Sequence, residues 1–468
     1  MATQGTGRVN FAFIGLIVAV ATIGGFMFGY DSGVINGTQD GLNKTFDLSK
    51  LGTGLNVGAI LLGCAAGAFI AGRLADVIGR RSVMMIAAVL FVFSALGAGA
   101  ATSSIMFILA RIVGGLGVGA ASVLAPVYIS EVVPASIRGR LSSIQQVMII
   151  TGLTGAFAAN AYLAHVAGGS THNLWLDYPA WRWMFWLQVI PAVIYFFTLL
   201  LIPESPRYLA MKGRDAEAEA VLTKLFGADH AREKVAEIRD SLAADHHRPR
   251  FSDLLDASGK VRPIVWAGIG LAVFQQFVGI NIVFYYGSVL WQSVGFSESD
   301  ALLTNVLLGL ISIGACVFTI FTVDRIGRKP LLLIGSVGMA ISLALMAYCF
   351  STATTGAAGM HMTPMIGKLA FASALAYSAL FNLSWGPIMW VMLGEMFPNQ
   401  IRGSGLAVSG LAQWGANFLI SVSFPWMAAN AGLPMTYGFY AASAFVSYFF
   451  VKALVNETKG RELEDMVG

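Results

Sequence analysis

The sequence predicts an all-α integral membrane protein in which twelve transmembrane helices form two six-helix bundles. Three observations predict this fold: the composition, the long apolar runs and an internal repeat of charged motifs. Of the 468 residues, 56% are hydrophobic and 12% are charged, and the mean hydropathy is +0.71. A soluble chain carries about a quarter of charged residues. So few charges could not cover so large a core, so apolar surface must face lipid.

The apolar runs are long enough to cross a bilayer, which takes about 20 residues in a helix. Twelve spans are predicted, at 11–35, 51–72, 82–101, 105–129, 140–166, 183–202, 263–290, 301–323, 330–352, 368–393, 404–430 and 435–455. The loops at 73–81 and 324–330 are rich in Arg and Lys, whereas 291–300 and 353–367 carry none. The positive-inside rule therefore places both termini in the cytoplasm.

A polar segment at 204–262 divides the spans into two sets of six. It carries 11 basic and 11 acidic residues, and its few apolar residues recur at helical spacing. We expect bundles at 1–203 and 263–455, joined by short cytoplasmic linker helices at 204–262 and followed by a tail at 456–468. The linker is either a solvated connection or part of a gate, and its sequence favours neither.

Charged motifs repeat in order between the two bundles. Asp-Val-Ile-Gly-Arg-Arg at 76–81 returns as Asp-Arg-Ile-Gly-Arg-Lys at 324–329, and Glu131 to Gly139 returns as Glu395 to Gly403. Pro-Glu-Ser at 203–205 is echoed by Asn-Glu-Thr at 456–458. Each motif follows the corresponding span of its half, so the bundles are predicted to be a parallel repeat about an axis along the membrane normal.

These motifs place charges of both signs at cytoplasmic helix ends. We expect carboxylates and guanidiniums to pair between the halves and to hold the cytoplasmic side shut as a gate. The alternative is that the charges only orient the helices. The predicted gate residues are Asp76, Arg80, Arg81, Glu131, Arg138, Glu204, Arg207, Asp324, Arg328, Glu395, Arg402 and Glu457.

Glycines spaced four apart occur in several spans and allow helices to approach closely. The pairs are Gly54 with Gly58, Gly63 with Gly67, and Gly115 with Gly119.

An acidic residue, Asp31, lies within the first apolar span, where an ionised carboxylate needs a partner or a proton. Arg111 in the fourth span is the basic residue at matching depth, because the two helices run in opposite directions. The residues leave two roles open: a permanent ion pair that fixes packing, or a carboxylate that takes up and releases a proton.

Three motifs carry a family resemblance. They are Asp-Val-Ile-Gly-Arg-Arg at 76–81, Pro-Glu-Ser-Pro-Arg at 203–207 and Gln-Gln-Phe-Val-Gly-Ile-Asn at 275–281. Together they resemble the sugar porters of the major facilitator superfamily, among them bacterial proton-coupled xylose and glucose/galactose symporters. The resemblance runs from about residue 20 to the C-terminus, and Asn456 departs from it where the family usually has proline.

Amides and aromatic side chains gather in spans 7, 10 and 11, and span 5 adds the glutamines Gln145 and Gln146. Amides both donate and accept hydrogen bonds and aromatic faces cover apolar C–H surface, which suits a sugar. For a single glutamine, a hydrogen bond between helices is the simpler explanation. The expected substrate-binding residues are Gln146, Gln275, Gln276, Asn281, Tyr285, Phe381, Trp390, Gln413, Trp414 and Asn417. Gly279, between the glutamines and Asn281, and Gly386-Pro387 are expected to interrupt their helices.

The resemblance implies residue roles within this set. It assigns sugar contacts to Gln146, Gln275, Gln276, Asn281, Trp390 and Gln413, and closure over the sugar to Tyr285 and Phe381. Leu153 and Ser312 depart from the family, since relatives often carry amides there. Fewer amides suggest a pentose, or an apolar contact with a hexose.

By resemblance, an aspartate in this motif of span 1 implies proton coupling, because uniporters among the relatives carry asparagine there. We therefore expect a proton-coupled monosaccharide symporter of the bacterial inner membrane, for xylose or glucose, acting by alternating access. The proton is the coupling ion, with Asp31 and Arg111 as coupling residues. A proton-independent facilitator and a non-transporting sugar sensor are the alternatives.

Other functions are disfavoured. No nucleophile–base constellation indicates an enzyme, and neither a cofactor nor a metal site is expected, since the three cysteines lie in apolar runs. The net charge of +4 gives no nucleic-acid signal. The expected partners are the sugar and the lipid bilayer, with the chain as a monomer.

Overall fold

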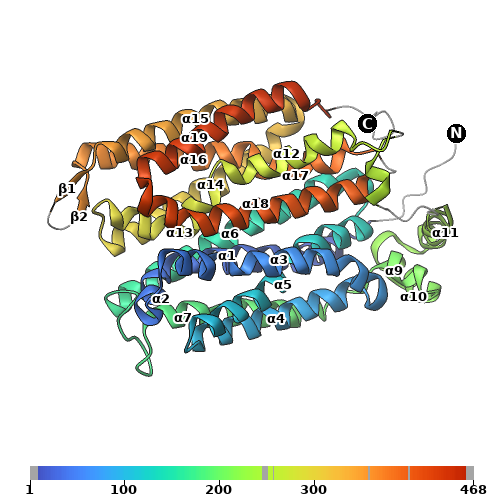
Figure 1. Ribbon diagram of the computed structural model, residues 1–468. Helices are drawn as coiled ribbons and strands as arrows, with labels where there is room; N and C mark the ends of the chain where they lie inside the picture. Colours follow the sequence, from blue (N-terminus) through green and yellow to red (C-terminus); the bar gives the residue numbers. More distant parts are fainter. Residues whose placement is uncertain (1–8, 245–250, 257, 357–358, 399–400, 460–468) are drawn as a thin grey trace.

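The computed structural model describes residues 9–244, 251–256, 258–356, 359–398 and 401–459. Long helices lie roughly parallel to one another in two groups, α1–α8 below and α12–α19 above in Figure 1. The start of α1 and the end of α19 lie at the same end of the molecule, which we call the terminal end. The opposite end is called the far end.

The first group holds eight α-helices and a short 3₁₀ helix among the described residues. They are α1 (Phe11–Gly33), η1 (Val34–Gly37), α2 (Gln39–Phe46), α3 (Lys50–Ile78), α4 (Arg80–Ala100), α5 (Ser104–Val132), α6 (Ala135–Ala167), α7 (Ala180–Leu187) and α8 (Val189–Leu199).

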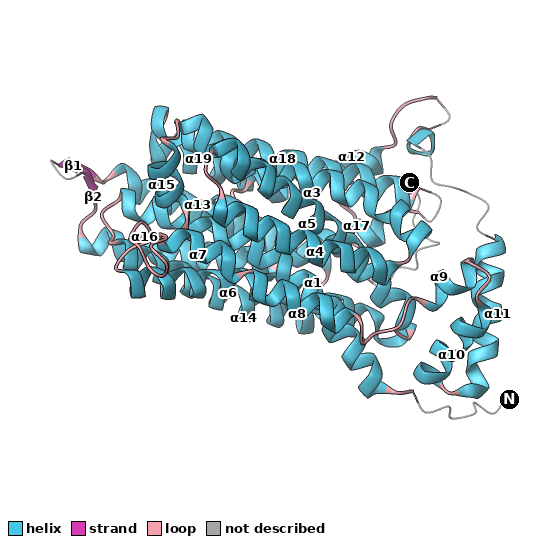
Figure 2. Cartoon of the chain, turned by 90° about the horizontal axis from the view of Figure 1, so that it is seen from below, coloured by secondary structure: helices cyan, strands magenta, loops and turns pink. Residues whose placement is uncertain are grey.

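Shorter elements follow at the terminal end, where Figure 2 shows them standing apart from the long helices. They are α9 (Pro206–Met211), α10 (Asp215–Phe226), α11 (Ala228–Ala244) and η2 (Phe251–Leu254). Short helices were predicted here, and the apolar side chains of Leu222, Leu225 and Phe226 are buried.

The second group repeats the first, with a small hairpin at the far end. It contains α12 (Pro263–Phe277), α13 (Ile280–Ser293), α14 (Glu298–Ile326), α15 (Arg328–Ser351), β1 (Thr354–Gly356), β2 (Gly359–His361), α16 (Pro364–Leu383), α17 (Trp385–Met396), α18 (Arg402–Asn430) and α19 (Gly432–Leu454).

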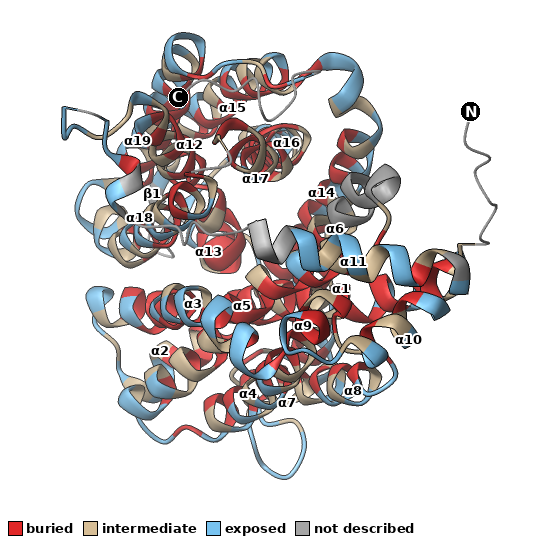
Figure 3. Cartoon of the chain, turned by 90° about the vertical axis from the view of Figure 1, so that its right-hand side faces the viewer, coloured by how far each residue is buried: buried red, intermediate tan, exposed pale blue. Residues whose placement is uncertain are grey.

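All twelve predicted apolar runs lie on helices. Eleven stretches of the described residues are long and apolar enough to cross a membrane. The twelfth run forms α19, whose tyrosines and serines lower its hydropathy although it has 23 residues. Large apolar side chains such as Phe93, Phe321 and Ile341 point outward and are exposed, while buried residues lie between helices (Figure 3). This distribution is the one expected of a bundle surrounded by lipid.

Three of the predicted spans are broken into two helices. Gly279 separates α12 from α13 with φ +84°, a conformation that favours glycine, as predicted. The break between α16 and α17 falls at Ser384, because Pro387 lacks the N–H that would bond the carbonyl of Leu383. Span 6 was predicted to be continuous, yet it breaks at Gln188. Pro191 explains this break in the same way.

Glycines set the closest helix contacts. A β-carbon added at Gly63 of α3 would lie 2.1 Å from the carbonyl oxygen of Ile112 in α5, and one at Gly115 would lie 2.1 Å from that of Ile60. At Gly29 of α1 the added atom would lie 1.8 Å from the carbonyl oxygen of Ile149 in α6. Backbones this close exclude any side chain. The pairs Gly63–Gly67 and Gly115–Gly119 therefore act at the α3–α5 contact, whereas Gly54 and Gly58 of α3 face Val422 of α18.

We predict that Gly63→Ala lowers the stability of the protein, because its methyl group must push α3 away from α5. Overpacking of this kind costs about 1–3 kcal/mol. Thermal unfolding of the detergent-solubilised protein measures the effect. Gly72→Ala on the same helix is the control, since nothing lies within 4 Å of its added β-carbon. Equal melting temperatures for the two variants would contradict the prediction.

Candidate sugar and proton site

Asp31 and Arg111 form a buried ion pair, as their predicted depths require. Both side chains are at most 1% exposed. One guanidinium nitrogen of Arg111 donates to Oδ1 of Asp31, and Nη2 donates to the backbone carbonyl of Asp31 at 2.8 Å. The guanidinium also lies 5.6 Å from the ring centre of Phe185. An isolated charge here would be costly, so each ion depends on the other.

A chain of amides runs past the break in span 7. Asn281 donates to Gln276 at 2.5 Å, and Gln276 donates to Gln275 at 3.0 Å. Gln275 then donates to the carbonyls of Trp385 and Gly386, at 3.1 and 3.3 Å, next to the break in span 10. The two interrupted helices therefore place three of the predicted sugar ligands in one network. Gln276 and Asn281 each donate only one of these bonds, so each retains a second N–H donor for a ligand.

Other predicted ligands lie on α13 and α18. The hydroxyl of Tyr285 interacts with the side chains of Asn417 and Ser32. The Trp414 ring lies 5.9 Å from that of Phe28 in α1, so it bridges the two halves. The Oε1 atom of Gln413 is buried and accepts no hydrogen bond.

The remaining predicted ligands are less closely associated. The ring of Phe381 packs where Gly386 leaves room, 3.1 Å from the β-carbon that Gly386 lacks. Gln146 is half-buried, and Trp390 is 40% exposed. The described contacts do not bond either of these two to the amide chain.

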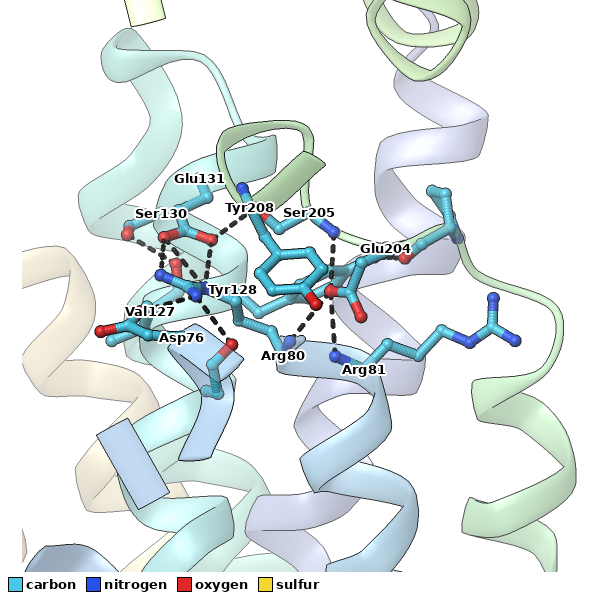
Figure 4. A network of polar contacts seen from close by, with 12 residues as sticks. Asp76, Arg80, Arg81, Val127, Tyr128, Ser130, Glu131, Glu204, Ser205 and Tyr208 are labelled. Carbon is cyan, nitrogen blue, oxygen red and sulfur yellow. Dashed lines mark hydrogen bonds and ion pairs between the residues drawn. The ribbon is translucent and has the colours of Figure 1, made fainter. Parts of the chain in front are cut away.

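A charged cluster ties together helix ends of the first half (Figure 4). Arg80 forms a bidentate pair with Glu131 at 3.0 Å for each bond and donates to Asp76 at 2.9 Å. Ser205 donates to Glu131 at 2.5 Å. The cluster therefore joins α3, α4, α5 and the segment after α8.

Glu204 caps α4 within the same cluster. Its carboxylate accepts the backbone N–H groups of Arg80 and Arg81, at 3.0 and 3.1 Å. Gly79 precedes them with φ +102° and leaves no room for a β-carbon, which would lie 2.2 Å from the Glu204 carboxylate. A carboxylate at a helix N-terminus satisfies free N–H groups and opposes the helix dipole.

The second half repeats this cluster. Arg328 pairs with Glu395 at 2.9 and 3.1 Å and with Asp324 at 2.8 Å. Thr458 replaces the serine and donates to Glu395 at 2.5 Å. Glu457 accepts the first two backbone N–H groups of α15, at 3.0 and 2.9 Å. Despite Asn456, the repeated glutamate keeps the capping role.

These contacts correct the expected geometry of the gate. The ion pairs of both clusters join helices of the same half, whereas pairing between the halves was predicted. The reason is reach: each arginine begins a helix whose neighbours in its own bundle present the carboxylates. Arg402 donates to the carbonyl of Phe397 at 3.2 Å. The side chain of Arg138 lies outside the described residues, and Arg207 also has an interaction partner.

Polar bonds between the halves lie at the far end, and the sequence analysis did not predict them. Asn36 of η1 donates to the carbonyl of Phe284 at 2.7 Å and accepts from Asn305 at 2.9 Å. Gln292 donates to Asp40 at 2.9 Å. The only sequence signal was the run of polar residues that follows Asp31.

Asp40 and Glu457 are among the carboxylates outside the spans whose pKa values are shifted. Burial raises the pKa of Asp40; the bond from Gln292 opposes this and the charge of Glu298 adds to it. Burial tends to raise the pKa of Glu457, but four backbone N–H groups at the start of α15 and after α19 outweigh it, so the pKa is lowered.

Known proteins share both the sequence and the fold. A family described as "Sugar (and other) transporter" matches residues 17–467. The glucose transport protein of Synechocystis sp. is 49% identical over 99% of this chain and 98% of its own. The D-xylose-proton symporter of Escherichia coli K12 is 38% identical over 98% of this chain and 96% of its own.

A solved structure of the xylose transporter XylE from E. coli, in a partially occluded inward-open conformation, superimposes with a TM-score of 0.83. It is 36% identical, and the match covers 96% of this chain and all of the other. Fold and site thus define a multi-pass membrane transporter of two repeated halves rather than an enzyme. The chain belongs to the sugar transporter family.

We predict that Glu457→Gln destabilises the protein near neutral pH, because the amide is a weaker acceptor for the N–H groups of α15. The lowered pKa means that the carboxylate stabilises the fold above its ordinary pKa of 4.5 and loses this effect as pH falls through the lower folded value. The difference in melting temperature between wild type and variant should therefore shrink below pH 4.5. A difference that is independent of pH would contradict this role.

Proposed function

We propose that the protein is a proton-coupled symporter that imports a monosaccharide across the bacterial inner membrane. The sugar class rests on the family and on relatives named for glucose and D-xylose transport. The arginine-rich terminal end supports cytoplasmic termini by the positive-inside rule. One chain carries both the sugar and the proton site, so a monomer suffices.

The observation that best supports a sugar-binding site is the amide chain, which lies at two facing helix breaks. Gln275, Gln276 and Asn281 are already ordered by one another, so they lose little freedom on binding a ring of hydroxyls. The unpartnered Oε1 of Gln413 is an acceptor that a sugar hydroxyl can satisfy. Trp414 and Phe381 supply apolar surface for the sugar C–H face.

The substrate is a pentose or a hexose, with xylose and glucose favoured by the relatives' names. Leu153 is 4% exposed and packs against Gly33, and Ser312 bonds Ser378 at 2.7 Å. Neither supplies the amide that the family often places there. The proposed sugar site therefore has fewer amides available for polar contacts.

Proton coupling follows from the chemistry of the buried pair. A proton on Asp31 cancels the charge that Arg111 neutralises, which weakens the bond between α1 and α5. Sugar and proton bind while the far end is open, the halves 1–203 and 263–455 rock about the sugar, and both are released at the terminal end. Arg111 then favours return of Asp31 to its ionised form.

The gates lie at opposite ends in this scheme. The far-end bonds of Asn36 and Gln292 close the periplasmic side in the present conformation. The charged clusters brace each half, and we propose that they approach one another when the terminal end closes. Among the described linker helices, α9 and α10 contact α5 and α1 of the first half and would move with it, whereas η2 contacts α18 of the second half.

A proton-independent facilitator is the second candidate. The observation that favours it is the completeness of the Asp31–Arg111 pair, which can serve as a fixed packing contact.

We predict that Asp31→Asn abolishes uphill, proton-driven sugar accumulation and retains counterflow, because asparagine carries no exchangeable charge but preserves the volume. Uptake into proteoliposomes with and without an imposed pH gradient measures both activities. Asp47→Asn is the control, since that aspartate is exposed in the turn after α2. Full accumulation by Asp31→Asn would exclude symport through this residue and favour the facilitator.

We predict that Gln276→Leu raises the KM for sugar by about fivefold to a hundredfold, since it removes the central amide of the chain. Loss of one to two hydrogen bonds at a buried site corresponds to about 1–3 kcal/mol. Initial rates of xylose and glucose uptake measure the change. Gln145→Leu is the matched control, because Gln145 packs against Gly25 of α1. Equal KM values for the two variants would contradict the proposal that the amide chain binds the sugar.

A further inference from the structure

The carboxylate of Asp31 has one oxygen that Arg111 does not engage. Arg111 bonds Oδ1 and turns its other terminal nitrogen to the backbone carbonyl of Asp31. Oδ2 is buried and has no hydrogen-bond partner. A buried carboxylate oxygen without a donor is unfavourable, so a second partner is expected.

Ser94 of α4 supplies a candidate. It is 1% exposed, and its hydroxyl also has no hydrogen-bond partner. Several other hydroxyls in the spans bond a carbonyl of their own helix, as Thr22, Thr151 and Ser342 do with the residue four positions earlier. Ser94 does not make this bond, so its hydroxyl is available to another group.

The two unpartnered oxygens converge on one point of α5. A β-carbon added at Gly114 would lie 2.4 Å from Oγ of Ser94 and 2.8 Å from Oδ2 of Asp31. Because glycine has no β-carbon, this space stays open. Both oxygens border the same open space, and rotation of the serine side chain can turn its hydroxyl toward Oδ2.

We propose that Ser94 is a positioning residue of the coupling site, in which its hydroxyl hydrogen-bonds Oδ2 of Asp31 and Gly114 keeps the space between them open. This inference rests on the proposed role of Asp31. Since the guanidinium occupies Oδ1, the transported proton is carried on Oδ2. The hydroxyl donates to the ionised carboxylate and accepts from the protonated one, so it serves both states.

The groups that face Asp31 leave this role to Ser94. Of the charged or titratable side chains, Arg111 from α5 holds Oδ1, and Cys64 from α3 and Tyr285 from α13 interact with the pair over a longer range. From α8, Tyr195 lies beside Gly24, two turns away along α1. The residues of α6 nearest to this part of α1, Ile149 and Leu153, are uncharged.

The test is the pH dependence of proton-driven uptake by Ser94→Ala. Loss of the hydroxyl donor disfavours the ionised carboxylate of Asp31, so this carboxylate should keep its proton up to a higher pH in the variant than in the wild type. We expect the pH at half-maximal uptake to rise by about half a unit to one unit. Ser94→Thr keeps the hydroxyl and should restore the wild-type profile. If the pH dependence of uptake by Ser94→Ala coincides with that of the wild type, even at a lower rate, the proposal is overturned.

A second variant approaches the same contact from α5. Gly114→Ala places a methyl group between the two oxygens and should shift the profile in the same direction. Gly117→Ala is its control, because that position faces Ala87 and Phe91 of α4. An unchanged profile for Gly114→Ala would count against the proposal.

The failure of this inference is distinguishable from failure of symport. If Asp31→Asn abolishes accumulation while Ser94→Ala leaves the pH profile unchanged, only the role of Ser94 is wrong. If Asp31→Asn accumulates sugar normally, the coupling role itself is wrong, and with it the inference.

Discussion

The buried pair between Asp31 and Arg111 sets the arrangement of the first half, because neither charge can remain at this depth alone. Removing an ion from water costs several kcal/mol, and only close pairing recovers it. The helices that carry the pair are therefore held together, and glycines make this possible. Gly29 brings α1 against α6, and Gly115 brings α5 against α3. The packing around the charges is tight, so a change of charge at Asp31 acts directly on helix contacts.

The two charged clusters explain how each half stays intact while such contacts change. Arg80 and Arg328 each join a carboxylate on their own motif to one on another helix, and Glu204 and Glu457 cap the following helices. Each cluster bonds several helix ends within its half. The halves are connected by polar bonds at the far end and by the packing of α3 on α18 and of α6 on α14. A rocking motion would change these contacts and conserve the interior of each half.

Apart from Gln146, the proposed sugar ligands lie in the second half, whereas the ion pair lies in the first, so the proposed coupling has to cross the interface between them. Tyr285 is placed for this, since its hydroxyl interacts with Ser32, the neighbour of Asp31, and with Asn417 among the sugar ligands. The helix breaks serve the same site. The carbonyls of Trp385 and Gly386, at the start of α17, accept from Gln275 and orient the amide chain.

The sequence by itself determined the spans, their two-fold repeat and the partner of Asp31, because hydropathy, motif spacing and depth are properties of the linear chain. The breaks at Gly279 and near Pro387 were readable for the same reason. Only the tertiary structure decided that Arg80 pairs with Glu131 within its own half, that Glu204 caps a helix, and that Asn36 bonds across the far end. These contacts depend on which helix ends are neighbours and on the conformation of the halves. A linear pattern of charges specifies neither, since every carboxylate of the motif is an equally good partner until the helices are packed.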